Sequence, residues 1–241
     1  MDLINKIYLS KTPLTYALSI NFGTIAEYLI ELGVDINKTD GWGWTPLHHA
    51  YFKGNTKIIK ILVDHGADKN KCGKYKGIDT PLIFSLTSEY TIAIHNRFDV
   101  TTCLIDLGAD LNKKSMDGYT PLIKVCQKED QYLMEYLVEH GADVNQHDRN
   151  KNIPLIIACQ KENKKIIKYF VEHGANVNVK NKKGDTPLTI ANRNKDEDIA
   201  KYLLEHGTDI HFKSDYGFIP LYILAINIVS LSIFLTKKYN H

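Results

Sequence analysis

Apolar and polar positions alternate at helical spacing through residues 141–178. A short apolar cluster at 155–159 precedes a polar turn at 160–163, and apolar residues then return at 166, 167, 170 and 171. The spacing i, i+1, i+4, i+5 is typical of a helix with one buried face and does not fit a strand. The pattern therefore predicts a unit of turn, short helix, turn and second helix, with the polar turn segment projecting sideways.

Proline and glycine mark the ends of the predicted helices. Proline suits a first helical turn because its missing N–H would have no partner there, and a preceding threonine can cap the helix. Glycine tolerates the left-handed conformation that closes a helix C-terminus. All seven prolines recur at the start position, each followed by Leu and five preceded by Thr: Pro13, Pro46, Pro81, Pro121, Pro154, Pro187 and Pro220.

A second motif keeps phase with the prolines and opens with a glycine. It reads Gly33-Val-Asp-Ile-Asn37 in its first copy and Gly141-Ala-Asp-Val-Asn145 in a later one. A fixed period near 33 residues predicts a stacked solenoid. We expect residues 1–241 to form one array of about seven repeats: 1–37, 38–70, 71–112, 113–145, 146–178, 179–211 and a divergent 212–241.

The run from Thr45 to Ala50, Thr-Pro-Leu-His-His-Ala, followed by Gly-Ala-Asp-x-Asn, resembles the ankyrin repeat. The resemblance implies an all-α solenoid with projecting β-hairpin loops. It also implies a concave face of inner helices and hairpin tips that binds proteins without catalysis. The motif histidine is kept at His48 alone, and we expect weaker hydrogen bonding at the helix starts that carry other residues: Thr15, Ile83, Ile123, Ile156, Thr189 and Tyr222.

Composition narrows the function classes further. A net charge of +2 is too small to predict nucleic-acid binding or membrane attraction. The four cysteines lack metal-ligand spacing and indicate buried thiols in a reducing, cytoplasmic compartment. The N-terminal segment lacks the pattern of a secretory signal. Because no phosphate-binding loop, metalloprotease motif or nucleophile elbow occurs, we expect no enzyme, no cofactor and no metal.

Four histidines stand immediately before a motif glycine, where a helix is predicted to end: His65, His140, His173 and His206. Stacked elements lie about 8–10 Å apart, whereas a histidine–zinc bond is about 2 Å. A metal ladder is therefore not expected. Imidazole is favoured at a helix C-terminus by the macrodipole.

Charge is concentrated in residues 146–195, which hold eleven Lys or Arg and four Asp or Glu. Lys164, Lys165 and Lys168 are predicted on the outer face of a second helix. Lys180, Lys182 and Lys183 are predicted on a hairpin. Because the cluster has no aromatic residues at its tip, two interpretations stay open: a solvated face, or a surface for an acidic protein partner.

The tips of the predicted hairpins carry the candidate binding residues. Aromatic side chains dominate interface hot spots, although a ring at a tip can instead pack on the neighbouring hairpin. If these rings bind a partner, replacing Trp42 or Trp44 by Ala should weaken binding and leave the helices intact. The predicted protein-binding residues are Trp42, Trp44, Tyr75, Tyr119, Asn152, Asp185, Tyr216 and Phe218.

Two segments depart from the regular repeat. Residues 71–79 hold two extra residues and 87–98 hold seven more. Such insertions often lie on the binding face, but a neutral loop extension is an equal alternative. The uncharged stretch 218–235 approaches the length of a membrane helix. We favour a seventh repeat whose Leu231 and Phe234 face outward, to be covered by a partner, a second copy or a lipid surface.

Overall fold

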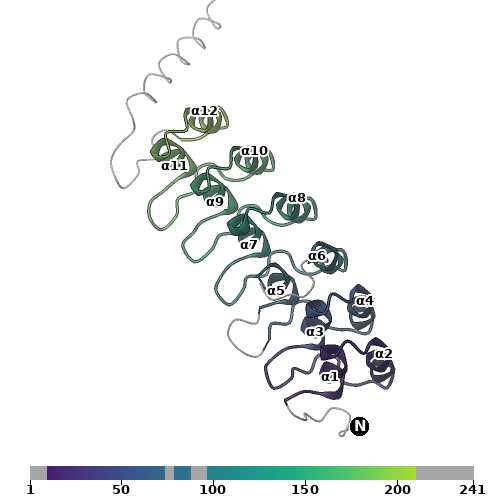
Figure 1. Ribbon diagram of the computed structural model, residues 1–241. Helices are drawn as coiled ribbons and strands as arrows, with labels where there is room; N and C mark the ends of the chain where they lie inside the picture. The colour runs from purple at the N-terminus through teal and green to yellow at the C-terminus, as the bar shows by residue number, and fades with distance from the viewer. Residues whose placement is uncertain (1–9, 74–78, 88–96, 210–241) are drawn as a thin grey trace, which may run out of the picture. The chain divides into compact units, whose positions relative to one another are not determined.

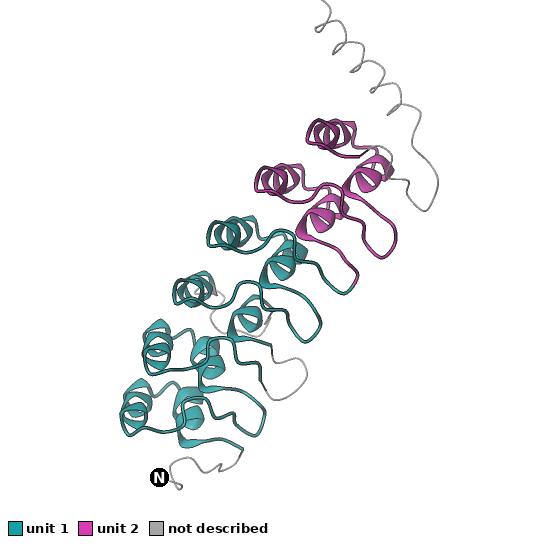
Figure 2. Ribbon diagram, turned by 180° about the vertical axis from the view of Figure 1, so that it is seen from behind, with its two compact units in different colours: residues 1–149 teal, residues 150–241 magenta. Residues whose placement is uncertain are grey.

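The computed structural model describes residues 10–73, 79–87 and 97–209 of this chain. In these ranges the chain forms twelve α-helices and no β-strand (Figure 1). The all-α prediction is therefore confirmed, and the projecting loops are turns without assigned strands. The chain divides into two compact units, residues 1–149 and 150–241 (Figure 2).

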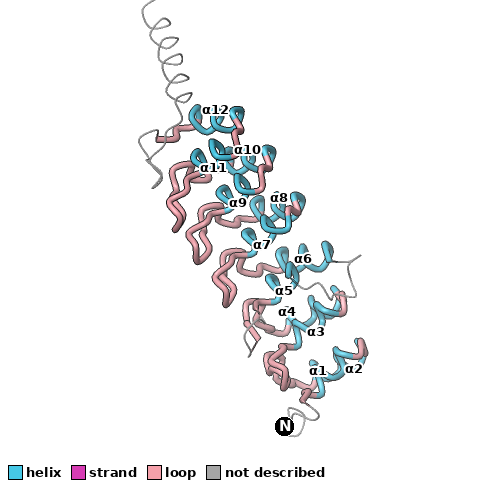
Figure 3. The backbone as a smooth tube through the Cα atoms, turned by 60° about the vertical axis from the view of Figure 1, so that its left-hand side comes forward, coloured by secondary structure: helices cyan, strands magenta, loops and turns pink. Residues whose placement is uncertain are grey.

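The first unit holds four helix pairs in two layers. First helices α1, α3, α5 and α7 contact one another in sequence, and second helices α2, α4, α6 and α8 do the same (Figure 1). The loops between pairs extend from the first-helix side (Figure 3). The helices are α1 Pro13–Ser19, α2 Gly23–Glu31, α3 Pro46–Phe52, α4 Thr56–Asp64, α5 Pro81–Thr87, α6 Arg97–Asp106, α7 Pro121–Lys128 and α8 Gln131–Glu139.

The second unit repeats the same arrangement with two helix pairs among its described residues. Helix α9 (Pro154–Gln160) contacts both α10 (Lys164–Glu172) and α11 (Pro187–Arg193), and α11 contacts α12 (Glu197–Glu205). Every first helix in both units therefore starts at one of the periodic prolines, as the sequence predicts.

Threonine caps explain why the helices start where they do. In α3 the Thr45 hydroxyl accepts from the His48 backbone N–H at 3.3 Å, and His48 Nδ1 accepts from the Thr45 backbone N–H at 3.3 Å. Such a cap stabilises by about 1 kcal/mol. Helices α1 and α11 make the same reciprocal pair through Thr15 and Thr189. The expectation of weaker hydrogen bonding is wrong at these two positions, because a threonine hydroxyl accepts as the imidazole does.

At α9 that expectation holds. Ile153 precedes the proline there and makes no side-chain cap hydrogen bond. The helix is held instead by burial, since Leu155, Ile156 and Cys159 are all at most 2% exposed. Packing can therefore replace a cap within the same repeat architecture.

The helix C-termini close as predicted. Gly141 has φ 96°, in the left-handed region that a side chain disfavours. At four of the helix ends a histidine precedes the glycine, and its Nδ1 donates to the carbonyl four residues earlier. His140 does so to Tyr136 at 2.8 Å, and their rings stack with centroids 4.0 Å apart. His65, His173 and His206 make the same bond. These histidines are end-of-helix residues.

The motif asparagines join neighbouring repeats within each unit. Asn37 Oδ1 accepts from the Asp68 backbone N–H at 2.8 Å, and Asn37 Nδ2 donates to the Gly66 carbonyl at 3.0 Å. Asn178 repeats both bonds in the second unit, to Asp209 and Gly207. The asparagine at this position therefore pairs backbone groups that two successive turns would otherwise leave to solvent.

Cysteines behave as small apolar residues. Cys126 and Cys159 are 4% and 2% exposed, and all four cysteines are free. Burial raises the pKa of Cys126 well above its usual range and that of Cys159 to about 12. The prediction of buried thiols is confirmed for Cys103, Cys126 and Cys159, and it is wrong for Cys72, which is only half-buried because it lies on a loop outside the helices.

Several predictions fall outside the described residues. They concern most of the insertion 87–98, the seventh repeat 212–241, the stretch 218–235, and the residues Tyr75, Tyr216, Phe218, Leu231 and Phe234. No helix within the described ranges combines the length and apolar character needed to cross a membrane.

Candidate functional site

A short polar side chain organises the loop tips of the second, fourth and sixth repeats. In the second repeat, Asp40 Oδ1 accepts from the backbone N–H groups of Trp42 and Trp44 at 2.9 Å each. The Asp40 N–H donates to the Trp44 carbonyl at 2.9 Å, which closes the turn. Asn181 in the second unit accepts from Lys183 and Asp185 in the same way. The tip backbone is thus fixed before any partner binds.

Asp40 also joins the tip to the first helix of its own repeat. Its Oδ2 lies 2.7 Å from His49 Nε2, and the two side chains are 0% and 6% exposed. Because a carboxylate can only accept, His49 Nε2 donates. Burial raises the pKa of Asp40, but the hydrogen bonds from His49, Trp44 and Trp42 more than offset it, so the pKa lies below its ordinary value. The tip therefore carries an ionised carboxylate at neutral pH.

The two tryptophans differ in their surroundings. Trp44 is half-buried, with its ring centroid 5.0 Å from those of His49 and Phe84 and 5.4 Å from that of Phe52. Trp42 is 53% exposed. Trp44 therefore packs against its neighbours and is also a candidate binding residue, and the expectation that Trp44→Ala leaves the helices intact stays a prediction. Trp42 is the one whose ring is mostly open to solvent.

In the first, second and fourth repeats, the residue two positions before the proline contacts its own first helix. In the first repeat Lys11 donates to Ser19 Oγ at 2.7 Å. In the fourth, Lys124 Nζ lies 4.2 Å from the Tyr119 ring centroid. Together with the contacts of Trp42 and Trp44, these pairs form what we call the inner strip of the first unit: Lys11, Tyr16, Ser19, Trp42, Trp44, His49, Phe52, Asp79, Phe84, Tyr119 and Lys124.

The predicted binding residues that stand two positions before a proline differ in their exposure to solvent. Tyr119 and Asn152 are half-buried, and Asp185 is 3% exposed and bonded to Arg193. Asp79, its counterpart in the third repeat, is 7% exposed and accepts from the Met116 backbone N–H at 2.8 Å. The two aspartates therefore order loops, whereas the aromatic members present ring surface.

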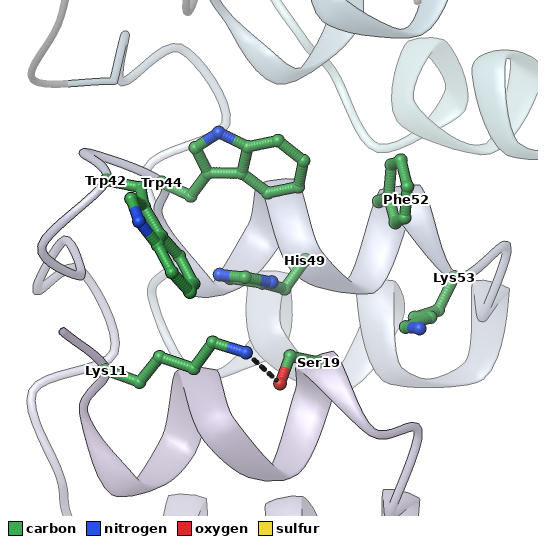
Figure 4. Close-up of a pocket in the computed structure, with 7 residues that line it drawn as sticks. All are labelled: Lys11, Ser19, Trp42, Trp44, His49, Phe52 and Lys53. Carbon is green, nitrogen blue, oxygen red and sulfur yellow. Dashed lines mark hydrogen bonds between the residues drawn. The ribbon is translucent and has the colours of Figure 1, made fainter. Parts of the chain in front are cut away.

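A cavity of about 300 Å³ opens on the inner strip beside Trp42 (Figure 4). In this view the Trp44 ring lies above His49 and the Trp42 ring to its left, while Phe52 and Lys53 lie on the right and Lys11 approaches from below, from the preceding repeat. Its lining residues are Lys11, Ser19, Trp42, Trp44, His49, Phe52 and Lys53. The first unit thus has an aromatic, concave site at the position of the predicted tip residues.

Sequence reasoning missed Lys11, Ser19, His49, Phe52 and Lys53 as members of this site. A register comparison could have found three of them, since Ser19 and Phe52 each stand six residues after a proline, and Lys11 occupies the Trp44 position of its repeat. The cavity itself depends on how two repeats stack, and one repeat read alone does not show it.

The basic cluster of the second unit is exposed, as predicted, at Lys164, Lys165 and Lys168. Lys164 Nζ lies 2.9 Å from Asp196 and 3.1 Å from Asp198, and these contacts raise its pKa. Lys182 and Lys183 are exposed on the loop before α11. Part of the cluster's charge is therefore balanced within the unit.

The ankyrin-repeat family model, described as ankyrin repeats in three copies, matches residues 1–72, 89–181 and 133–214. This chain belongs to the ankyrin-repeat family. Ankyrin repeats generally serve as protein–protein interaction modules and not as catalysts.

Solved ankyrin domains share the fold. The ankyrin repeat domain of Bcl-3, a member of the IkappaB protein family, superposes with a TM-score of 0.73 at 24% identity, over 88% of this chain and 92% of that one. An ankyrin repeat domain from Acinetobacter baumannii AYE gives a TM-score of 0.69 at 24% identity, over 82% of this chain and 98% of that one.

Curated relatives match shorter stretches. A putative ankyrin repeat protein of Fowlpox virus (strain NVSL) is 33% identical over 106 residues, 44% of this chain and 14% of that protein. The 2-5A-dependent ribonuclease of Mus musculus is 42% identical over 60 residues, 24% of this chain and 8% of that protein. The matched region therefore spans a small part of each of these relatives.

Proposed function

We propose that this chain is a non-catalytic binding module whose first unit holds a protein partner on the inner strip, centred on Trp42. The observation that carries the proposal is the cavity of about 300 Å³ between two tryptophans, Phe52 and two lysines. Exposed aromatic rings beside a pocket are the usual anchors of a protein interface.

The hydrogen bonds that fix the site before a partner binds support the same function. The Asp40 carboxylate fixes both the tip backbone and His49, so the Trp44 ring that forms one wall is held before binding. A site ordered in advance binds with a smaller entropic cost than a loop that must order on contact. The four free cysteines support a reducing compartment as the place where the module works.

A peptide-display selection on the full chain tests this function. The proposal expects enriched peptides that bind the wild type and lose binding to Trp42→Ala. A matched control is Tyr28→Ala, because Tyr28 is 60% exposed on α2, away from the inner strip. Peptides that bind Trp42→Ala as well as wild type, or no enrichment at all, would contradict the proposed function.

A further inference from the structure

Charge in the cavity beside Trp42 has one sign. Its lining residues include the ammonium groups of Lys11 and Lys53 and no carboxylate. Asp40, which bonds the lining residue His49, has a side chain that is 0% exposed. No carboxylate within the described ranges lies at ion-pair distance from either lysine. The open side of the cavity therefore presents two uncompensated cationic groups.

Two contacts fix the position of the Lys11 ammonium group at the cavity. Its Nζ donates to Ser19 Oγ at 2.7 Å and lies 5.0 Å from the Trp42 ring centroid. An ammonium group has three donors, so one hydrogen bond leaves N–H groups for a ligand. The cation over the ring also stabilises the exposed Trp42 face in one orientation.

The walls, in contrast, are apolar. Trp42, Trp44 and Phe52 present ring surface to the cavity, and Figure 4 shows both indole rings beside it. A volume of about 300 Å³ lies at the small end of ligand-binding pockets. It suits one large side chain of a partner, and it cannot take a helix or a folded element.

The same charge pattern extends along the inner strip of the first unit. Lys124 stands over Tyr119 two repeats further on, again as a cation paired with a ring. The one carboxylate in the strip, Asp79, is 7% exposed and accepts a backbone hydrogen bond. A chain crossing this strip therefore meets aromatic rings and ammonium groups. Complementary charge at such a surface selects an acidic partner and speeds its association.

We propose that the cavity beside Trp42 takes one aromatic side chain from an acidic segment of a partner protein, whose carboxylates pair with Lys11 and Lys53. This inference rests on the proposed function and adds the chemistry of the partner. The aromatic side chain supplies apolar contact with Trp42, Trp44 and Phe52, while the flanking carboxylates set the specificity.

The two tryptophans of the chain both line this cavity, so intrinsic tryptophan emission reports on this site alone. The probe is the peptide Gly-Asp-Glu-Asp-Phe-Glu-Asp-Glu-Gly, which contains no tryptophan, titrated into the full chain. One comparison peptide replaces Phe by Ala, and another replaces every Asp and Glu by Asn and Gln. We expect saturable emission change with the first peptide and affinity at least about tenfold lower for each of the others.

Protein variants separate this site from general charge attraction. Lys53→Glu should lower the affinity for the acidic peptide by about tenfold. The milder change Lys53→Gln should lower it by about threefold. The matched control is Lys60→Glu, since Lys60 is exposed on α4 and does not line the cavity. That control should stay within about twofold of wild type. Circular dichroism confirms that each variant keeps its helices.

The result that overturns the inference is equal affinity for the acidic and neutral peptides, or equal loss in the Lys53 and Lys60 variants. Emission change with phosphatidylserine vesicles, but not with the acidic peptide, would also overturn it. If display-selected peptides bind through Trp42 but carry no acidic residues, the proposed function stands and this inference fails. If no peptide binds, both fail.

Discussion

Acid should weaken the fold through His48, a histidine that no solvent reaches. His48 is 0% exposed. Its Nδ1 faces the Thr45 backbone N–H at 3.3 Å, so Nδ1 accepts, and Nε2 therefore carries the hydrogen that it donates to the Asp79 carbonyl at 2.8 Å. Both ring nitrogens are satisfied in the neutral form. Protonation would place a second hydrogen against a backbone donor.

The magnitude follows from the shifted pKa. Burial lowers the pKa of His48 from 6.5 to about 4, and the hydrogen bond to Asp79 only partly opposes this. Between these values the unfolded state binds more protons than the folded state, so stability is complete above pH 6.5 and falls as the pH is lowered toward 4. The loss across that window is about 3 kcal/mol.

Urea unfolding followed by tryptophan emission measures this, because both tryptophans lie in the same repeat as His48. His48→Thr keeps a helix-start hydrogen bond, as Thr15 and Thr189 do, and should remove most of the pH dependence in this window. His65→Gln is the control, since His65 is an exposed helix cap. The reasoning would be refuted if the unfolding free energy of the wild type did not change between pH 6.5 and 4. It would also be refuted if the unfolding free energy of His48→Thr fell with pH as steeply as that of the wild type.

Three further results are expected. Asp40→Ala should lower the free energy of unfolding in urea by about 3 kcal/mol, because it removes the acceptor of three hydrogen bonds. Asp40→Asn keeps one acceptor oxygen and should lower that free energy by about 1 kcal/mol. Equal losses in the two variants would contradict this reasoning. Trp44→Ala should lower stability by about 2 kcal/mol, and Trp42→Ala by less than about 0.5 kcal/mol, which thermal melts would distinguish. Iodoacetamide at neutral pH should label Cys72 first and Cys126 only on unfolding, and mass spectrometry that finds native Cys126 labelled as fast as Cys72 would contradict its burial.

The positions of the first helices could be predicted from the sequence because each depends on local chemistry. A proline at the first turn removes one orphan donor, and a threonine before it accepts from another at α1, α3, α5, α7 and α11. Gly141 requires a conformation that other residues disfavour. The histidine caps were predictable for the same reason. These features need no knowledge of how repeats stack.

The candidate site was predictable only in part. Trp42 and Trp44 were found because aromatic residues at a tip are visible in the repeat register. The rest depends on long-range packing: Asp40 bonds His49 nine positions away, and Lys11 reaches the cavity from the preceding repeat. Whether a tip ring packs or stays open also depends on its neighbours, which differ for Trp42 and Trp44 although they stand two residues apart.

The central claim is that Trp42 anchors a protein partner, and the most direct test is the dissociation constant of one display-selected peptide measured on wild type and Trp42→Ala. The account predicts a constant at least about tenfold higher for the variant, with an unchanged melting temperature. A constant within about twofold of wild type, at equal stability, would contradict it.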